Sequence, residues 1–576
     1  MDRGSTALTS EVGGAGGHTA QDQPARQGTR PTRAVTLLLF SAFAVYAAAF
    51  IWRTSFVVDG VRTFCLFDDG MVSMRYARNL AHGYGLVWNP GGERVEGFTN
   101  PLWTAYMALW HLLPVSASKI SLPIQITSAV CLFASLFFIK RLARDLSGGS
   151  EFAALAAVAL AGFSLPVLNW SLQGLEVGPL VLLLSAAVSV ALRALATARF
   201  SLLPYLLLGV ATLLRLDAFV VIATVTLFGL LWDRPHRRQH LLAGLGTLLL
   251  FGGGQTLLRL WYFGDPLPNT YYLKLTGYPA AFRLLHGAMA YYDFVIALPW
   301  WLLLVAFVPM ALRRTHGHAL LALLFLTQSA YSIYVGGDAW EWWGGANRYL
   351  CLALPFFLLL VALGLDQMRR WATAALLASP PLPRAAVRVA AVLAVAACLV
   401  FSNACGPTTL REWLLLTPPL HREDNAVNVR TAALLRQATT PQALVALSWA
   451  GAIPYFSDRP CHDLLGKSDR HIAHETVRIF LNWGMAGGFV PGHLKYDFDY
   501  SVVKLQPDVM LRDTSRGPQQ KAFVAAHYRP YFLGEQEALL RLDSPNIRWD
   551  VLRRLDAAER ERRWPTAGTA APSRSP

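Results

Sequence analysis

Long apolar runs, separated by short polar segments, dominate the chain between residues 34 and 403. Most of these runs approach the ~20 residues that an α-helix needs to cross a bilayer. Unpaired backbone groups are costly in hydrocarbon, so each run should be a helix. The predicted spans are 34–52, 119–139, 151–168, 175–194, 201–215, 217–232, 240–262, 294–312, 318–335, 349–367 and 386–403.

Basic residues recur in every second loop between these spans. Because cytoplasmic loops carry the excess of Lys and Arg, these loops should be cytoplasmic. They contain Lys140, Arg141 and Arg144; Arg193 and Arg199; Arg234, Arg237 and Arg238; Arg313 and Arg314; and Arg369 and Arg370. The apolar segment Pro101–Pro114 is too short to cross and is interpreted as interfacial or re-entrant. About eleven spans then place the N-terminus inside and the C-terminal region outside.

Four further regions are distinguished by their composition. Residues 1–33 lack apolar periodicity and are predicted to be a disordered cytoplasmic tail, and residues 556–576 a second disordered tail. Residues 53–118 form a large outer loop, in which Gly70–His82 has the pattern of a short helix lying along the membrane surface. In residues 404–555 charges and prolines return, which predicts a small mixed α/β domain with a helix at 425–438 and a strand at 443–447.

The composition agrees with a polytopic membrane protein. The 576 residues are 54% hydrophobic and only 15% charged, against about 25% charged residues in soluble chains. The net charge of +15 could suggest nucleic-acid binding. The basic residues cluster between apolar runs instead, which is the pattern that orients membrane proteins, so nucleic acid is excluded as a partner.

Five polar clusters fall on the outer side of this topology. They are Asp68-Asp69 followed by 89–100; 170–176; the Arg215-Leu216-Asp217 hairpin tip; 262–272; and 336–348. Each has an ordinary structural explanation. Adjacent aspartates are usually solvated, acidic groups suit helix starts, the Gly264–Pro268 stretch could be a turn, and the tryptophans after residue 339 could form an interfacial belt. Their joint placement on one face favours a functional site.

Transfer of a sugar from a lipid phosphate would use such a set of residues. A carboxylate of Asp68 or Asp69 could take the proton from an acceptor hydroxyl, and neighbouring carboxylates can split their pKa values. Arg215 and Arg348 could neutralise the departing phosphate. The candidate residues for binding sugar or acceptor are Asn100, Gln173, Glu176, Asp265, Asn269, Asp338 and Trp340.

The segment Phe67–Trp103 resembles the first-loop signature of a bacterial family of GT-C glycosyltransferases, whose best-known members are the terminal β-(1→2)-arabinofuranosyltransferases of mycobacterial cell-wall synthesis. Shorter stretches in the same order are similar to its other motifs. These are Gly174–Glu176, Leu214–Asp217, Gly264–Thr270, Gly336–Asp338, Asn347–Tyr349, Ala450–Tyr455, and Asp463–Gly466 with Asp469. The resemblance covers roughly residues 60–510.

This resemblance implies a polyprenyl-phosphate sugar donor, plausibly of arabinofuranose, and a cell-wall or surface glycan acceptor outside the cytoplasmic membrane. It also implies that the acidic pair Asp68 and Asp69 is essential, with Asp68 favoured as the base and Asp69 as a positioning group. Two residues depart from the family pattern: Leu216 stands where proline is usual, and Gly70 where alanine is usual. Both departures leave the reactive groups in place, and both leave the sugar open.

Two other functions compete with the transferase. A transporter or flippase of lipid-linked sugars would be expected to carry its binding residues near the middle of the membrane. Most of the polar clusters are predicted at the outer surface, which favours an enzyme. The third alternative is a catalytically inactive glycan-binding protein. No metal or other cofactor is predicted, although Asp68 and Asp69 could hold Mg²⁺ or Ca²⁺ through oxygen ligands.

Overall fold

The computed structural model describes residues 29–312, 315–341, 347–378, 384–404, 406, 409–478 and 489–555. The tail predicted for residues 556–576 lies outside these ranges, and so do residues 1–28 of the N-terminal tail. The first helix, α1 (Thr29–Thr54), already begins inside the range predicted as tail. Such a helix can extend past the apolar run because its backbone hydrogen bonds need no hydrocarbon around them.

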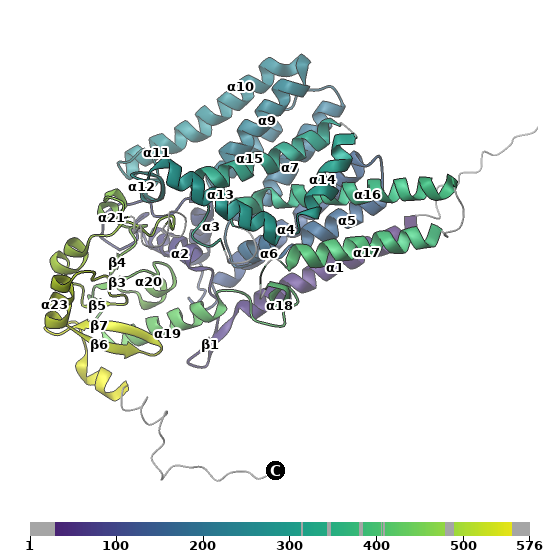
Figure 1. The fold of residues 1–576 in the computed structure, drawn as a ribbon. Helices are drawn as coiled ribbons and strands as arrows, with labels where there is room; N and C mark the ends of the chain where they lie inside the picture. The colour runs from purple at the N-terminus through teal and green to yellow at the C-terminus, as the bar shows by residue number, and fades with distance from the viewer. Residues whose placement is uncertain are drawn as a thin grey trace, which may run out of the picture.

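Helices make up the part of the chain predicted to lie in the membrane, as Figure 1 shows. Six helical segments are long and apolar enough to cross a bilayer, or up to eight if each of two bent helix pairs is one span. The chain is therefore a multi-pass membrane protein. After α1 the helices are α4 (Ser121–Leu146), α5 (Glu151–Gly162), α6 (Leu165–Leu172), α7 (Val177–Ala196), α8 (Leu203–Leu214), α9 (Ala218–Trp232), η1 (Arg234–His236), α10 (Arg237–Thr247), η2 (Leu248–Gly253), α11 (Gly254–Tyr262), α12 (Asn269–Leu275), α13 (Ala280–Ala297), α14 (Trp301–Leu312), α15 (His316–Val335), η3 (Leu350–Leu352), α16 (Leu354–Ala378) and α17 (Arg384–Asn403).

Two predicted spans are bent rather than straight. The span predicted at 151–168 consists of α5 and α6, which meet at 51°, and the span predicted at 294–312 falls on α13 and α14, which meet at 88°. Ser164 and Pro166 lie at the first bend, and Pro299 lies at the second. Proline cannot continue the helical hydrogen bonds across such a break. Hydrophobic periodicity alone shows the length of a run but not a bend within it.

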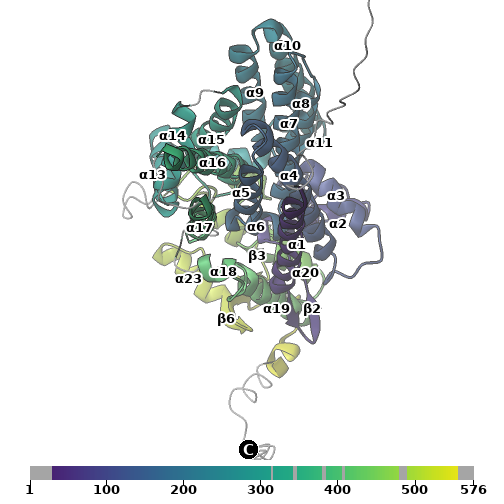
Figure 2. The same cartoon turned by 90° about the vertical axis from the view of Figure 1, so that its right-hand side faces the viewer.

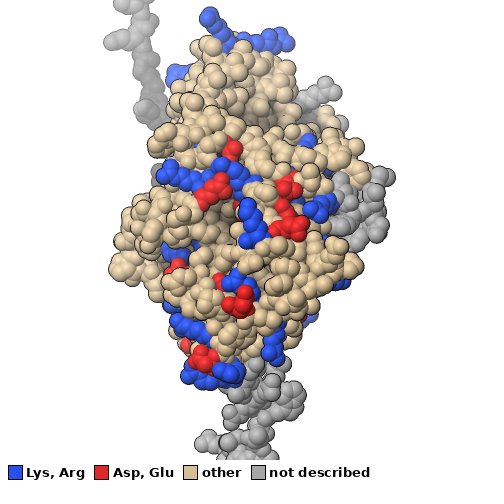
Figure 3. Space-filling model, turned by 90° about the vertical axis from the view of Figure 1, so that its left-hand side faces the viewer, with Lys and Arg blue, Asp and Glu red and all other residues tan. Residues whose placement is uncertain are grey.

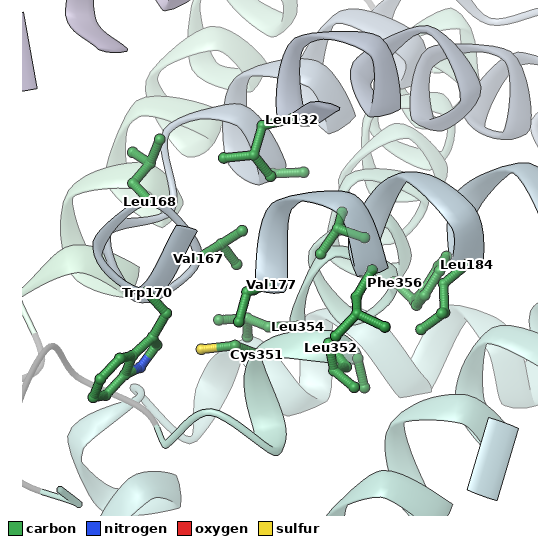
Figure 4. Close-up of a cluster of buried hydrophobic side chains, with 14 of the residues drawn as sticks. Leu132, Val167, Leu168, Trp170, Val177, Leu184, Cys351, Leu352, Leu354 and Phe356 are labelled. Carbon is green, nitrogen blue, oxygen red and sulfur yellow. The ribbon is translucent and has the colours of Figure 1, made fainter. Parts of the chain in front are cut away.

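The core of the helical domain lies where α4, α6, α7, η3 and α16 meet. Figure 4 shows side chains from all five elements, including Val167, Val177, Cys351 and Phe356, directed toward one another. Trp170 lies at the edge of this cluster, and the guanidinium of Arg348 lies 5.8 Å from the centre of its ring. The packed core thus ends directly beneath one of the candidate site residues.

The first outer loop folds into a hairpin and two helices. Strands β1 (Phe56–Val58) and β2 (Val61–Thr63) pair antiparallel, and α2 (Asp68–Ala81) and α3 (Pro101–His111) follow. The helix predicted at Gly70–His82 is confirmed, but α2 begins earlier, at Asp68. Instead of lying open along a surface, α2 packs against α3 and against the C-terminal domain. Arg75, with 1% of its surface exposed, donates hydrogen bonds to backbone carbonyls of Trp88, Pro454 and Arg459.

The C-terminal domain is mixed α/β, as predicted. Its sheet is built from β3 (Val445–Leu447), β4 (Cys461–Asp463), β5 (Val509–Met510), β6 (Tyr528–Leu533) and β7 (Gln536–Arg541). The strand order is β4-β3-β5-β7-β6: β3 pairs parallel with β4 and with β5, and β7 pairs antiparallel with β5 and β6. The predicted helix 425–438 is α19, and the predicted strand 443–447 is β3. The elements are α18 (Thr409–Trp413), α19 (Arg422–Ala438), β3 (Val445–Leu447), α20 (Ala452–Ser457), β4 (Cys461–Asp463), α21 (Arg470–His474), η5 (Asp499–Lys504), β5 (Val509–Met510), α23 (Pro518–His527), β6 (Tyr528–Leu533) and β7 (Gln536–Arg541).

The two domains meet along α2. Figures 1 and 2 show the sheet and its helices at one end of the helical domain, with α20 beside α2. On the face shown in Figure 3, a broad band nearly free of charge separates basic side chains at the upper end from acidic and basic side chains that gather in the middle and lower parts. Such a band is expected of a surface that faces lipid.

Candidate active site

Asp68 stands at the start of α2, and its carboxylate contacts the C-terminal domain. Its two oxygens accept hydrogen bonds from the backbone N–H groups of Gly451 (3.2 Å) and Ala452 (2.8 Å), where α20 begins. Gly451 is required for this approach, because a Cβ there would lie 1.9 Å from the carbonyl oxygen of Asp68. Burial raises the pKa of Asp68 to about 6, although the N–H of Ala452 opposes the shift.

Asp69, one residue further along α2, lies in a cluster of cations. One of its oxygens accepts a hydrogen bond from Nη1 of Arg348 (2.6 Å), and the other forms an ion pair with the ammonium of Lys467. Burial alone would raise the pKa of Asp69, but the charges of Lys467 and Arg348 hold it well below its usual range. Asp69 is therefore ionised and joins a cation of the helical domain to one of the C-terminal domain.

Arg348 is held in place by Asp338. The guanidinium donates to both carboxylate oxygens of Asp338, at 2.7 and 2.8 Å, in a two-point contact with good directional specificity. The turn after α15 makes this contact possible, since Gly336 and Gly337 both have positive φ (86° and 76°). The side-chain oxygen of Asn347 accepts the backbone N–H groups of the next turn, at residues 349 and 350, and so fixes the start of η3 beside Arg348.

Arg215 forms a second charged group at the hairpin tip between α8 and α9. Its Nε donates to Asp217 (2.8 Å), and its Nη2 donates to the backbone oxygen of Arg348 (3.1 Å). Glu176 lies 3.7 Å from its Nη1 and accepts a hydrogen bond from Asn100 (2.9 Å). Nη1 of Arg215 is buried and has no hydrogen-bond partner among the described residues.

Two cavities meet at the cation cluster. The first, with an empty volume of about 1100 Å³, is lined mainly by the helical domain, including Arg215, Tyr331 and Tyr349. The second, of about 770 Å³, lies between the N-terminus of α2 and the C-terminal domain and includes Asp68 and Trp449. The residues that line both are Asp69, Lys274, Arg348, Lys467 and Pro491.

Lys274 is a further cation at this boundary. It lies in α12, and within the described parts of the chain its ammonium takes part in no hydrogen bond or ion pair. Burial lowers its pKa to about 8, partly offset by the nearby carboxylates of Asp338 and Asp69. A lysine that faces two cavities without a carboxylate partner is available to bind an anion.

Solved structures with a similar fold are known. ArnT from Cupriavidus metallidurans bound to undecaprenyl phosphate has 14% sequence identity and a TM-score of 0.50, over 89% of this chain and 98% of that chain. The apo state of the same protein has 14% identity and a TM-score of 0.49, over 88% and 98% of the two chains. This chain has an ArnT-like GT-C fold.

Sequence comparison gives less information. A family model described as Domain of unknown function (DUF8728) matches residues 419–551, which lie within the C-terminal domain. No curated protein matches the chain. The similarity to ArnT is therefore found in the three-dimensional structure, whereas the sequence identity is low.

Within this ArnT-like fold, seven of the residues predicted from the sequence line the two cavities. Asp69 and Arg348 line both, Asp68 and Trp340 line the second, and Asn100, Glu176 and Arg215 line the first. They come from α2, from the segments before α3 and α7, from the tip between α8 and α9, and from the segment between α15 and η3. The fold brings these distant segments together, and the roles assigned to the residues remain predictions.

Four predicted sugar- or acceptor-binding residues lie outside both linings, and two of them, Asp338 and Asn269, support residues that line the cavities. Asp338 holds Arg348, as described above. The side chain of Gln173 is hydrogen-bonded to Asn169, and Asp265 forms an ion pair with Arg470 (3.0 Å). The amide of Asn269 donates to backbone oxygens next to Lys467.

Sequence reasoning missed Lys274, Lys467 and Trp449. Lys274 lies two residues beyond the polar cluster 262–272, and Lys467 lies inside the stretch from Asp463 to Asp469 that resembles a family motif. A basic residue close to a polar cluster or inside a motif-like stretch was the available signal for both lysines. Trp449 directly precedes the motif at Ala450, and no pattern separated it from an ordinary core residue.

One group of His, Asp and Glu residues in the described ranges has the spacing that could hold a metal ion. The ligand atoms of His471, Glu475 and Asp497 lie within 4.8 Å of one another. His471 is 44% exposed and is hydrogen-bonded to Asp497 at 2.9 Å. This group does not include Asp68 or Asp69.

Proposed function

We propose that the protein is a glycosyltransferase that moves a sugar from a polyprenyl-phosphate donor to a glycan acceptor. The observation that carries the proposal is the meeting of two cavities at a cluster of two aspartates and three cations, in a fold shared with ArnT. One ArnT structure is bound to undecaprenyl phosphate, which supports a lipid-linked donor here. Arabinofuranose is the sugar that the resemblance of the first loop implies.

The first cavity is suited to the lipid phosphate. Its lining includes residues of α12, of α15 and of the tip between α8 and α9, which belong to the membrane half of the molecule. Within the described parts of the chain Lys274 has no hydrogen bond or ion pair, and Arg215, whose Nη1 lies 3.7 Å from Glu176, contributes a second cation to the lining. Charge-assisted hydrogen bonds from such groups are strong, and Arg also matches phosphate geometrically.

The second cavity is suited to the acceptor. Trp340 and Trp449 lie in its wall with ring centres 5.9 Å apart, and aromatic rings of this kind offer a flat apolar face with a polar N–H at the edge. Asp68 lines this cavity, and its pKa of about 6 makes it an effective proton acceptor near neutral pH.

The reaction then follows from the positions of the groups. The acceptor hydroxyl oxygen forms a bond to the anomeric carbon of the sugar while the bond from that carbon to the phosphate oxygen breaks. The hydroxyl proton passes to Asp68. The polyprenyl phosphate leaves with the bonding electrons, and its added charge is neutralised by Lys274 and Arg348. Asp69 positions the cations and is not the base.

The orientation belongs to the same proposal. The positions of the basic loops support an orientation in which the cavities and the C-terminal domain lie on the outer side of the cytoplasmic membrane. We propose eleven spans. Three of them are the short apolar helices α8 and α9 and the helix α16, and the other eight are α1, α4, α7, α10–α11, α15, α17 and the bent pairs α5–α6 and α13–α14. The acceptor would then be a cell-envelope glycan.

Purified protein tests the proposal through transfer from polyprenyl-phosphate sugars, beginning with arabinofuranose, to an oligosaccharide of the same sugar. Wild type should transfer, Asp68→Asn should lose activity by about 10²–10⁴-fold as expected for loss of a general base, and Asp59→Asn should be unchanged. Asp59 is a matched control, because it is an exposed acidic residue of the same outer loop at positive φ (48°), which asparagine tolerates.

Three outcomes would contradict the proposal or a part of it. If the wild-type protein transferred no sugar from any polyprenyl phosphate, the proposed transferase activity would be refuted. If wild type and Asp68→Asn instead moved lipid-linked sugar across vesicle membranes equally well, without forming a glycoside, the transporter would be the correct function. Equal transfer by wild type and Asp68→Asn would refute the assignment of the base.

A further inference from the structure

A short loop of the C-terminal domain reaches into the site from outside the membrane half. This Lys467 loop, residues Asp463–Ser468, follows strand β4. Asp463 is buried, with 1% of its surface exposed, and accepts the backbone N–H groups of Leu465 (3.0 Å) and Ser468 (2.8 Å). The loop is therefore closed on itself by a side chain that the parallel β3–β4 pair holds in place.

A residue of the helical domain holds the Lys467 loop from the other side. The amide nitrogen of Asn269 lies within hydrogen-bond distance of the carbonyl oxygens of Gly466 (2.9 Å), Lys467 (3.0 Å) and Asp469 (3.1 Å). Asn269 is the first residue of α12, the helix that also carries Lys274. The same short helix thus anchors the loop and supplies the neighbouring cation.

These contacts determine where the side chain of Lys467 lies. Its ammonium pairs with Asp69 and lines both cavities. Burial alone would lower the pKa of Lys467, but the charge of Asp69 raises it, so the ammonium stays protonated. The other cations that line the first cavity, namely Arg215, Lys274 and Arg348, all come from the helical domain.

We propose that the C-terminal domain, which includes the region of unknown function at residues 419–551, serves to place Lys467 against the phosphate of the lipid donor. The proposal rests on the proposed transferase function and assigns to this domain a part of the donor site. Asp69 is the positioning residue that directs Lys467 to the boundary of the cavities, and Asn269 holds the backbone from which Lys467 extends.

Binding of undecaprenyl phosphate to the purified full-length protein tests this proposal. A charge-assisted hydrogen bond to phosphate corresponds to about 10- to 100-fold in affinity, so Lys467→Met should weaken binding by that factor. Lys467→Arg should recover most of it. Lys521→Met is the control, because Lys521 is an exposed lysine on α23 of the same domain, and this variant should bind as wild type does.

A pair of variants separates phosphate binding from a purely structural effect. Lys467→Met leaves Asp69 without one of its partners, whereas Asp69→Asn/Lys467→Met removes both charges of the ion pair. The double variant should bind as weakly as Lys467→Met, because the loss comes from the missing ammonium and not from the carboxylate of Asp69 that is left without a partner. Asn269→Ala should weaken binding by a smaller factor, since it loosens the loop and leaves the ammonium in place.

The failures of the two proposals can be told apart. If wild type binds undecaprenyl phosphate and the double variant binds it equally well, Lys467 is no part of the donor site and this inference is wrong, while the transferase proposal stands. If wild type binds neither undecaprenyl phosphate nor any polyprenyl-phosphate sugar, the transferase proposal itself is wrong.

Discussion

The rate of sugar transfer should depend on pH through two buried groups of opposite charge. Burial raises the pKa of Asp68 from its ordinary value to about 6 and lowers the pKa of Lys274 to about 8. Asp68 accepts a proton only in its ionised form, which prevails above its pKa. Lys274 attracts phosphate only in its protonated form, which prevails below its pKa. Transfer should therefore be fastest between about pH 6 and about pH 8.

The size of the effect follows from the titration of each group. One pH unit beyond either pKa leaves about a tenth of that group in its active form, so kcat/KM should fall about tenfold at about pH 5 and again at about pH 9. The measured quantity should be kcat/KM, because its pH dependence reports the groups of the free enzyme, and the pKa shifts here belong to the protein without substrate.

Lys274→Arg isolates the alkaline side of this profile. Arginine stays protonated throughout the accessible range, so this variant should lose the alkaline decline and keep the acidic one. The assay is the initial rate of transfer by wild type and variant in detergent, in overlapping buffers at constant ionic strength. An alkaline decline that is identical in both proteins would refute the role of Lys274. A flat wild-type profile would refute the roles of both groups.

Three further substitutions test the supports of the site. Arg348→Lys keeps the charge but loses the two-point contact with Asp338; kcat should fall by about 10²-fold or more with the fold retained, as judged by an unchanged unfolding temperature. Gly451→Ala places a Cβ 1.9 Å from the carbonyl oxygen of Asp68, so α2 and α20 should separate. The free energy of unfolding should fall by about 1–3 kcal/mol, and transfer should be lost. Unchanged kinetics would show that Asp68 need not be held by the backbone N–H groups of α20. Arg75→Met removes the hydrogen bonds by which one buried guanidinium joins carbonyls of the first loop and of the C-terminal domain. A destabilisation of about 3 kcal/mol is expected, measured by thermal unfolding. A loss of less than about 1 kcal/mol would show that Arg75 does not hold the two segments together.

Hydrophobic patterning predicted the helical segments well, because bilayer thickness sets a length that a sequence shows directly. It predicted neither the bends at α5–α6 and α13–α14 nor the burial of α2. The second error has a physical cause. The polar side of the predicted amphipathic helix was taken to face water, whereas Arg75 and Asn79 on that side are buried and hydrogen-bonded to backbone carbonyls.

The site residues that were predicted from the sequence are mainly those that are unusual in an apolar chain. Charged residues such as Arg215 and Arg348 stand out against their surroundings, and both line the first cavity. Lys467 does not stand out, since it lies in a domain that is rich in charge. Only the folded chain shows that strand β4 and the amide of Asn269 carry it to Asp69. Residues that act by supporting others, such as Asp338, likewise need the structure to distinguish them from residues that line a cavity.

The two aspartates of the first loop illustrate why a motif does not assign roles by itself. Successive residues of an α-helix point about 100° apart, so Asp68 and Asp69 at the start of α2 face different partners. Asp68 faces backbone N–H groups, which bind a carboxylate without supplying a full charge, and burial keeps its proton affinity high. Asp69 faces two full cations, which remove nearly all of its basicity. In the proposed reaction the same type of side chain is thus a proton acceptor at one position and a counter-ion at the next. Exchanging the roles would require moving the cations rather than changing the motif.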